Sequence, residues 1–263
     1  MPQPLTDAIN ALTAYANTVT GASDQTLSEA VATLASGYGS GGFSAGDIVA
    51  RTPINGDVVY NGTQTVMYDG LFAKTNITSF SSPSLTGAET GTRAFFQATS
   101  LKTLSMPNLA INHTGKCNDL CRDCTSLETV YLPKMIKWGS YSFSGCTSLH
   151  TVDISECTEL NTCTFADCNI QTIDLPKCTR MSNQSFLRNH NLTAVILRAS
   201  SVCYITNINV FQDTPLRGYG GTFSGHVYVP SALIASYKTA SNWSTLYSNY
   251  ADIFAPIEGS IYE

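Results

Sequence analysis

The sequence predicts an α+β protein, mainly β, in which a solenoid of about six turns follows an N-terminal helix pair and is capped at both ends. Two observations predict this fold. A dozen residues occur twice in close copy, CTSLETVYLPKM at 124–135 and CTSLHTVDISEC at 146–157. A unit of this length cannot bury its apolar face alone, so we expect the units to stack into one coil. Around these copies, an anchor recurs every 21 to 25 residues, at Phe72, Phe96, Leu120, Phe143, Phe165, Phe186 and Phe211.

A strand-like motif follows each of the first six anchors. In the copy LETVYLP, we expect Leu127, Val130 and Leu132 to point into the coil, and Thr129 and Tyr131 to point outward, because side chains alternate along a strand. Proline directly after the motif ends the strand, since it cannot donate an N–H. The other copies are ITSFSSP at 77, LKTLSMP at 101, LHTVDIS at 149, IQTIDLP at 170 and LTAVILR at 192.

The nine cysteines are best explained by the repeat. Cys124, Cys146 and Cys168 occupy one repeat position, so they should stack as a buried column, and Cys157 and Cys178 should form a second column after the strand. The cysteine number is odd, and the first residues lack the basic and apolar regions of a signal peptide. We therefore expect mostly reduced thiols.

A zinc site is the alternative for the segment CNDLCRDC, which contains Cys117, Cys121 and Cys124. The spacing is not that of paired C-x-x-C motifs, no clear fourth ligand follows, and the repeat already accounts for Cys124. We predict no bound metal and no cofactor.

The motif F-x-x-C-T-S-L-x-T-V-x-L-P, seen at Phe143–Ile154 and Leu120–Pro133, resembles the BspA-type leucine-rich repeat found in bacterial surface and phage-borne proteins. The resemblance implies a leucine-rich-repeat-like solenoid over residues 71–226. The segment from 227 to 257 resembles the cap that commonly follows such repeats, with a short helix from about Ser231 and a turn at Trp243, so we assign 227–263 to a C-terminal helical cap.

The first 36 residues are predicted to form the helix pair. The first helix has a narrow apolar stripe, and the second begins with a capping box formed by Thr26 and Glu29. Residues 37–46, GYGSGGFSAG, predict a flexible hinge. The stripe either folds back on the solenoid or contacts another copy of the chain. In the second case the oligomerisation residues are Leu5, Ile9, Leu12 and Val19.

This N-terminal segment resembles the N-terminal part of small tail-associated proteins of phages and prophages. That resemblance implies attachment to other particle or tail proteins through the N-terminus and a homo-oligomer, with a trimer favoured. Between hinge and repeats, residues 47–70 are assigned to an N-terminal cap, because the alternation around YNGT at 60–63 is typical of a hairpin and an open solenoid end exposes core and strand edge.

Catalytic motifs are absent from the sequence. The four histidines are far apart, and there is no G-x-S-x-G, H-E-x-x-H or P-loop. Asp153 and Asp174 share the outward position of neighbouring predicted strands, which would place them about 5 Å apart. Such a pair could hold a cation, shift one pKa or serve carbohydrate cleavage, or it could be two solvated acids. We predict that the protein is not an enzyme.

Composition excludes two further classes of function. Charged residues are 13% and the net charge is −5, which argues against a nucleic-acid partner because phosphates need a basic surface. The sequence has no run of about eighteen apolar residues, so we predict no membrane insertion.

The outward strand positions form the candidate ligand-binding strip. They offer hydroxyls, carboxylates and one aromatic ring, which suit a cell-surface glycan or protein, although they may equally be a polar sheet face. The first hypothesis is a non-enzymatic adhesin, a receptor-binding component of a phage or prophage tail, located on a virion tail or phage-derived particle. The alternatives are a purely structural particle or tail component and an adhesin at the bacterial cell surface. The strip consists of Thr129, Tyr131, Thr151, Asp153, Thr172 and Asp174.

Overall fold

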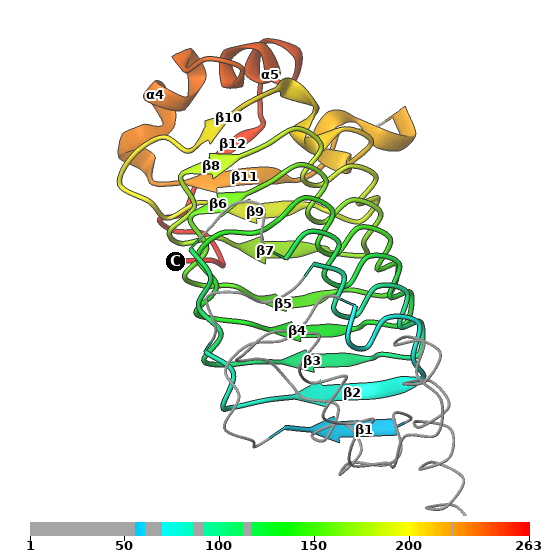
Figure 1. The fold of residues 1–263 in the computed structure, drawn as a ribbon. Coiled ribbons are helices and arrows are strands. Elements are labelled where there is room, and N and C mark those ends of the chain that lie inside the picture. The colour runs from blue at the N-terminus through cyan, green and yellow to red at the C-terminus, as the bar shows by residue number, and fades with distance from the viewer. Residues whose placement is uncertain (1–55, 61–69, 87–91, 113–116, 222) are drawn as a thin grey trace, which may run out of the picture.

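The computed structural model describes residues 56–60, 70–86, 92–112, 117–221 and 223–263. Figure 1 shows short strands stacked turn above turn, from β1 at one end to the helices α4 and α5 at the other. The strands are β1 (Gly56–Val59), β2 (Ile77–Ser81), β3 (Thr103–Ser105), β4 (Thr129–Tyr131), β5 (Thr151–Asp153), β6 (Glu159–Leu160), β7 (Thr172–Asp174), β8 (Arg180–Met181), β9 (Ala194–Ile196), β10 (Tyr204–Ile205), β11 (His226–Val229) and β12 (Phe254–Pro256). The helical elements are η1 (Ile208–Phe211), η2 (Pro215–Arg217), η3 (Tyr219–Gly221), η4 (Ser231–Leu233), α4 (Ile234–Thr239) and α5 (Trp243–Asn249).

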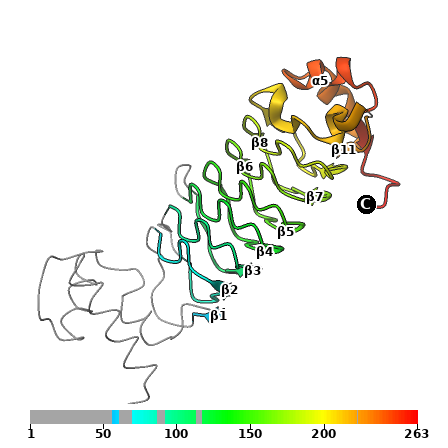
Figure 2. The ribbon, with the colours of Figure 1, turned by 90° about the vertical axis from the view of Figure 1, so that its right-hand side faces the viewer.

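The strands pair in parallel, because equivalent strands of successive turns run in the same direction. One sheet has the order β1-β2-β3-β4-β5, a second the order β12-β11-β9-β7, and a narrow third sheet the order β10-β8-β6. Seen from the side in Figure 2, β2, β3, β4, β5 and β7 line one edge of the stack and the connecting turns line the other. The fold is therefore mainly β with few helices, as the sequence predicts.

The predicted N-terminal regions fall largely outside the described residues. The helix pair with Leu5, Ile9, Leu12 and Val19, and the hinge at 37–46, are not among them. Of the expected capping hairpin, Gly56–Val59 is described, and it pairs with β2 in parallel. The second half of that hairpin falls on residues 61–69, which also lie outside.

The core of the stack is a column of aromatic rings. Consecutive rings are nearly parallel, with centroids 5.3 to 5.9 Å apart. Because rings of successive turns pack against one another on both sides of the turn that contains Cys121, the turns share one apolar interior. The rings belong to the pairs Phe72–Phe95, Phe143–Phe165, Phe165–Phe186 and Phe186–Phe211.

Two predicted anchors are wrong by one residue. The anchor's N–H donates to the carbonyl of the residue just before the next anchor, and Phe95 N donates to Leu120 O in this way at 2.8 Å. The anchors are therefore Phe95 and Cys121, in place of Phe96 and Leu120. The sequence is ambiguous here because Phe96 is aromatic like Phe95, and because Leu120 is as fully buried as the small Cys121.

The predicted thiol column is confirmed as buried. Cys124, Cys146 and Cys168 each lie close to the anchor carbonyl of the preceding turn, with Sγ–O distances of 2.9, 3.0 and 3.2 Å. Asn189 takes the same position in the next turn, where its side-chain amide donates to Phe165 O. Burial raises the pKa of the Cys146 and Cys168 thiols. The position therefore selects small side chains that satisfy a buried carbonyl.

The second thiol column is longer than the sequence predicts. Cys157 and Cys178 are buried, and Cys203 continues the column with its sulfur 3.9 Å from that of Cys178. Cys203 was missed because of its spacing: it lies seven residues after Ile196 at the end of β9, whereas Cys178 lies four residues after Asp174 at the end of β7. All nine cysteines are free thiols in the structure.

The C-terminal segment docks on Cys203 and extends the sheet. Trp243 Nε1 donates to Cys203 O at 2.6 Å, and Cys203 N donates to the Tyr237 hydroxyl at 2.9 Å. The strand β11 then pairs with both β9 and β12. Gly225 enters this pairing with a φ of 88°, and a Cβ there would collide with the Thr193 carbonyl, so only glycine permits the approach.

Candidate functional site

The outward face of β3, β4 and β5 is an open polar surface. Alternation buries Val130 completely and leaves Tyr131 43% exposed. The pairing register places Ser105, Tyr131 and Asp153 in one row across three strands. Thr129 and Thr151 lie in the neighbouring row. Four of the six predicted site residues therefore lie side by side on one rigid sheet.

The other two predicted site residues lie on a different sheet. Thr172 and Asp174 are outward and exposed on β7, but among the described residues β7 pairs with β9 alone and β5 pairs with β4 alone. Asp153 and Asp174 therefore do not lie opposite each other on hydrogen-bonded strands, and their separation of about 5 Å stays a prediction.

The two carboxylates also have separate partners. Asp153 Oδ1 accepts from Ser155 N at 3.2 Å. Asp174 is paired with Arg198, whose Nε lies 2.9 Å from Asp174 Oδ2. Asp174 is thus neutralised by Arg198, whereas Asp153 is held by a backbone N–H of its own turn, so we do not develop the shared cation site or the carbohydrate-cleaving pair further.

The outward face is covered beyond β7. Ala194 and Ile196 occupy the outward positions of β9, yet they are 2% and 1% exposed. They pack with Ile257, and Tyr228 and Tyr262 complete the cluster. Arg198 secures this arrangement, since its Nη2 donates to the Tyr262 carbonyl at 2.6 Å. The C-terminal residues therefore end the open surface.

The outward face begins at a small hydroxyl and carboxylate cluster. Asp57 Oδ1 on β1 accepts from the hydroxyls of Ser79 and Thr78 at 2.7 and 2.8 Å. These hydrogen bonds, that of Ser79 above all, lower the pKa of Asp57 below its usual range. The carboxylate is thus charged and held in place at ordinary pH.

A second ordered polar surface lies on the connecting turns, and sequence reasoning missed it. Residues such as Arg93, Tyr141, Cys163 and Gln184 adopt positive φ at equivalent places in successive turns, which directs their side chains along the stack. Asp119 lies between Arg93 and Arg122, at 3.5 and 3.2 Å. The sequence contained a signal for this surface, because residues of opposite charge such as Arg93 and Asp119 lie one turn apart.

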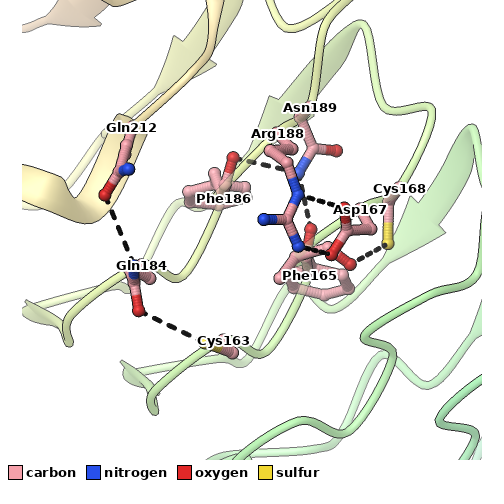
Figure 3. Close-up of polar contacts among 10 residues, drawn as sticks. Cys163, Phe165, Asp167, Cys168, Gln184, Phe186, Arg188, Asn189 and Gln212 are labelled. Atoms are coloured by element: carbon pink, nitrogen blue, oxygen red, sulfur yellow. Dashed lines mark hydrogen bonds and ion pairs between the residues drawn. The ribbon is translucent and has the colours of Figure 1, made fainter.

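Figure 3 shows the continuation of this turn surface. Arg188 Nη2 donates to Asp167 Oδ2 at 2.6 Å, and Gln184 lies between Cys163 and Gln212 with contacts of 3.8 and 3.3 Å. These contacts join one turn to the next and leave the polar groups largely satisfied. We therefore assign the turn surface to stability and keep the strand face as the candidate site.

The narrow third sheet offers a smaller exposed surface. Glu159, Arg180 and Tyr204 are in register on β6, β8 and β10. Tyr204 is 49% exposed, and the Arg180 guanidinium carbon lies 5.7 Å from its ring centroid. This pair provides an exposed tyrosine away from the strand face, which is useful as a control.

The described residues contain no group of three or more histidine, cysteine or acidic side chains placed to hold a metal ion. His150 Nδ1 lies 2.9 Å from the hydroxyl of its neighbour Thr151, whereas His113 falls outside the described residues. In the same part of the chain, every helix is too short or too polar to span a bilayer.

Comparison with family models identifies the repeat. The model of the BspA type leucine-rich repeat region, with 6 copies, matches residues 58–137 and 117–220. These two ranges together span more than half of the chain. The chain belongs to the BspA-type leucine-rich repeat family. The open strand face described above is thus a feature of a BspA-type repeat stack, and the match does not extend to the N-terminal segment that resembles tail-associated proteins.

Two solved structures resemble the BspA-type repeats of this chain. A leucine-rich repeat protein from Bacteroides ovatus ATCC 8483 is 16% identical, with a TM-score of 0.49, over 63% of this chain and 41% of that chain. A leucine-rich cell surface protein from Faecalibacterium prausnitzii A2-165 is 21% identical, with a TM-score of 0.40, over 57% and 49%. The chain therefore spans less than half the length of either. No curated protein sequence gives a significant match.

Proposed function

We propose that this chain is a non-enzymatic binding protein whose strand face recognises a cell-surface glycan or protein. One observation carries the proposal: Tyr131 is 43% exposed in the middle of a rigid sheet, in register with Ser105 and Asp153. A tyrosine fixed in this way offers a stacking face and a hydroxyl at little conformational cost. The membership of the BspA-type repeat family is consistent with a binding or adhesion role.

The second part of the proposal concerns where the protein is located when it binds. We place the protein on a phage or prophage tail, as a receptor-binding component held by its N-terminal residues as a homo-oligomer, with a trimer favoured. A bacterial surface adhesin is the second candidate, and the cell surface protein from Faecalibacterium prausnitzii A2-165, with its likeness in fold, makes that setting worth testing. A purely structural tail component is the third candidate, and it predicts no binding to cells.

The test is the substitution Tyr131→Ala, measured as attachment of the purified protein to bacterial cells and to a glycan array. We expect binding to fall by about 1–3 kcal/mol, as for truncation of a contact residue. The melting temperature should change little because the side chain fills no core position. Tyr204→Ala is the matched control, since it removes an equally exposed tyrosine from the narrow third sheet. Full binding by the Tyr131 variant, or equal loss in both variants, would overturn the strand-face assignment.

A further inference from the structure

The exposed tyrosines of the stack differ in what lies over their rings. The guanidinium carbon of Arg122 lies 5.1 Å from the ring centroid of Tyr141. The guanidinium carbon of Arg180 lies 5.7 Å from the ring centroid of Tyr204. A positive charge over the face of an aromatic ring is attracted by the negative potential of that face. At two exposed tyrosines, therefore, the preceding turn of the chain itself supplies a cation for the ring.

Tyr131 has no such partner. It is 43% exposed, and among the residues whose positions are described neither a cationic side chain nor a second ring lies over it. The fourth exposed tyrosine, Tyr219, is stacked on His190 with ring centroids 3.9 Å apart. Of the exposed tyrosines in the described part of the chain, Tyr131 alone therefore presents a bare ring to solvent.

The carboxylate beside this ring also lacks a cation. Asp153 is in register with Tyr131, and the hydrogen bond that it accepts comes from Ser155 N at 3.2 Å. Within the described residues, no lysine or arginine nitrogen lies within ion-pair distance of Asp153. Most acids between positions 119 and 174 do have such a nitrogen, within 3.9 Å at the farthest. They are Asp119, Asp123, Glu156, Glu159, Asp167 and Asp174.

Glu128 is the other acid of this range without an ion pair, and its surroundings differ. Its N–H donates to Lys102 O at 2.8 Å, so a lysine of the preceding turn is its neighbour along the stack. The row that contains Asp153 has the uncharged Tyr131 and Ser105 in the two preceding turns. The charge of Asp153 is therefore uncompensated, and it lies directly beside the bare ring.

We propose that Tyr131 and Asp153 bind an arginine side chain of a protein partner, an inference that rests on the proposed binding function. The guanidinium would lie over the Tyr131 ring and pair with the carboxylate of Asp153. The chain makes this arrangement itself at Tyr141, where Arg122 lies over the ring and pairs with Asp119 at 3.2 Å. On the strand face the ring and the acid are present, and the partner supplies the cation.

The chemistry of the two groups favours arginine over other ligands. A guanidinium is planar and weakly hydrated and presents several N–H donors, so it can stack on a ring and bind a carboxylate at the same time. A neutral sugar could stack on Tyr131 but would leave the charge of Asp153 uncompensated. The net charge of −5 also attracts a basic partner and repels an acidic one.

The experiment compares two peptides that differ in charge alone. Isotope-labelled protein is titrated with acetyl-Gly-Arg-Gly-amide and with the same peptide carrying citrulline, the neutral analogue of arginine, and amide shifts are followed by NMR. We expect the arginine peptide to shift the amides of Tyr131 and Asp153. It should bind about tenfold more tightly than the citrulline peptide, as expected for one exposed ion pair and one cation–π contact together. Equal affinity for the two peptides, or shifts confined to other parts of the chain, would overturn the proposal.

The variant Asp153→Asn tests the role of the carboxylate. We expect the preference for the arginine peptide to fall from about tenfold to roughly threefold, because the cation–π contact with Tyr131 remains. Asp213→Asn is the matched control, since it removes the same charge from an exposed residue of the connecting turns. Its φ of 56° is one that asparagine adopts readily, and its preference should stay at about tenfold. An unchanged preference in Asp153→Asn, or an equal fall in both variants, would contradict the proposal.

Attachment to bacterial cells separates this inference from the proposed function. Loss of attachment in both Tyr131→Ala and Asp153→Asn, with full attachment by Asp213→Asn, would support both. If Tyr131→Ala loses attachment while Asp153→Asn keeps it in full, the strand-face function stands, but its ligand is neutral and the arginine site is wrong. If the natural chain attaches to no cell or glycan yet prefers the arginine peptide, the arginine site stands and the cell-surface function fails. If it does neither, both proposals fail.

Discussion

The same repeat position is used in two ways along the stack. On β4 and β5 it holds Tyr131 and Asp153, which lie toward solvent. On β9 it holds Ile196, which is 1% exposed because the C-terminal residues Ile257 and Tyr262 pack over it. The positions are equivalent in the repeat, so the difference comes from the side chain at that position and from the C-terminal residues that pack on it.

This comparison teaches that the length of the binding surface is set by the chain's own C-terminus. An apolar side chain at the outward position favours packing by other residues over it, because that packing removes apolar area from water. A polar outward position stays open, since covering it would require a partner for every hydroxyl and carboxylate. Asp174 marks the border, as its carboxylate faces solvent on one side and is tied to Arg198 on the other.

Removing Trp243, which fixes the C-terminal segment to the stack, should have the largest effect on stability. Trp243 is fully buried, packs on Phe211, Tyr237 and Phe254, and donates to Cys203 O. We expect Trp243→Ala to lower the free energy of unfolding by about 3–5 kcal/mol through the lost contacts and the cavity. Denaturant unfolding followed by circular dichroism measures this. A loss below 1 kcal/mol would mean that the C-terminal segment contributes little to the stack.

Replacing the buried Ile196 by an acid, the residue type found at the open position of β5, should have the next largest effect on stability. Ile196→Asp places a charge beneath Ile257 and Tyr262, so the C-terminal residues should detach at a cost of roughly 2–3 kcal/mol, the value of one buried aliphatic side chain. Ser105→Asp is the matched control at the equivalent repeat position, where the cross-strand neighbours are Ser81 and Tyr131, and should cost below about 0.5 kcal/mol. Limited proteolysis of residues 257–263 and thermal melting measure the two effects. Equal melting temperatures for the two variants would contradict the comparison.

The repeat and its buried columns could be predicted from the sequence because they depend on local spacing. Alternation placed Tyr131 outward, and the recurrence of cysteine at one repeat position placed Cys146 in the core. The exact anchor was not predictable where Phe95 and Phe96 are adjacent and both aromatic. Spacing alone does not reveal which of two neighbouring rings turns inward.

The limits of the candidate site could not be predicted in the same way. The cover over Ile196 depends on a contact with Tyr262, which is distant in the sequence, and no local pattern encodes it. The lack of pairing between β5 and β7 had no clear local signal either, because the turn before β7 is one residue shorter than the turn before β9 and those two strands still pair. The oligomerisation residues Leu5, Ile9, Leu12 and Val19 remain predictions, because they lie outside the described residues.

Removing the Arg198 contacts, which lie between the open and the covered surface, should have the smallest effect on stability. It should still have a measurable effect on hydrogen exchange in residues 257–263. Arg198 has a side chain 34% exposed and pairs with Asp174, whose side chain is 46% exposed, so we expect Arg198→Gln to cost at most about 1 kcal/mol. Its Nη2 also donates to Tyr262 O, and losing that contact should speed hydrogen exchange in residues 257–263. Arg188→Gln is the matched control: it makes the same charge change and breaks the pair with Asp167 on the turn surface, away from the C-terminal residues. Faster exchange in the Arg198 variant alone would show that Arg198 holds residues 257–263 in place. Equal exchange in both variants would show instead that the apolar contact of Ile257 with Ile196 is sufficient, and that the border is set by packing and not by charge.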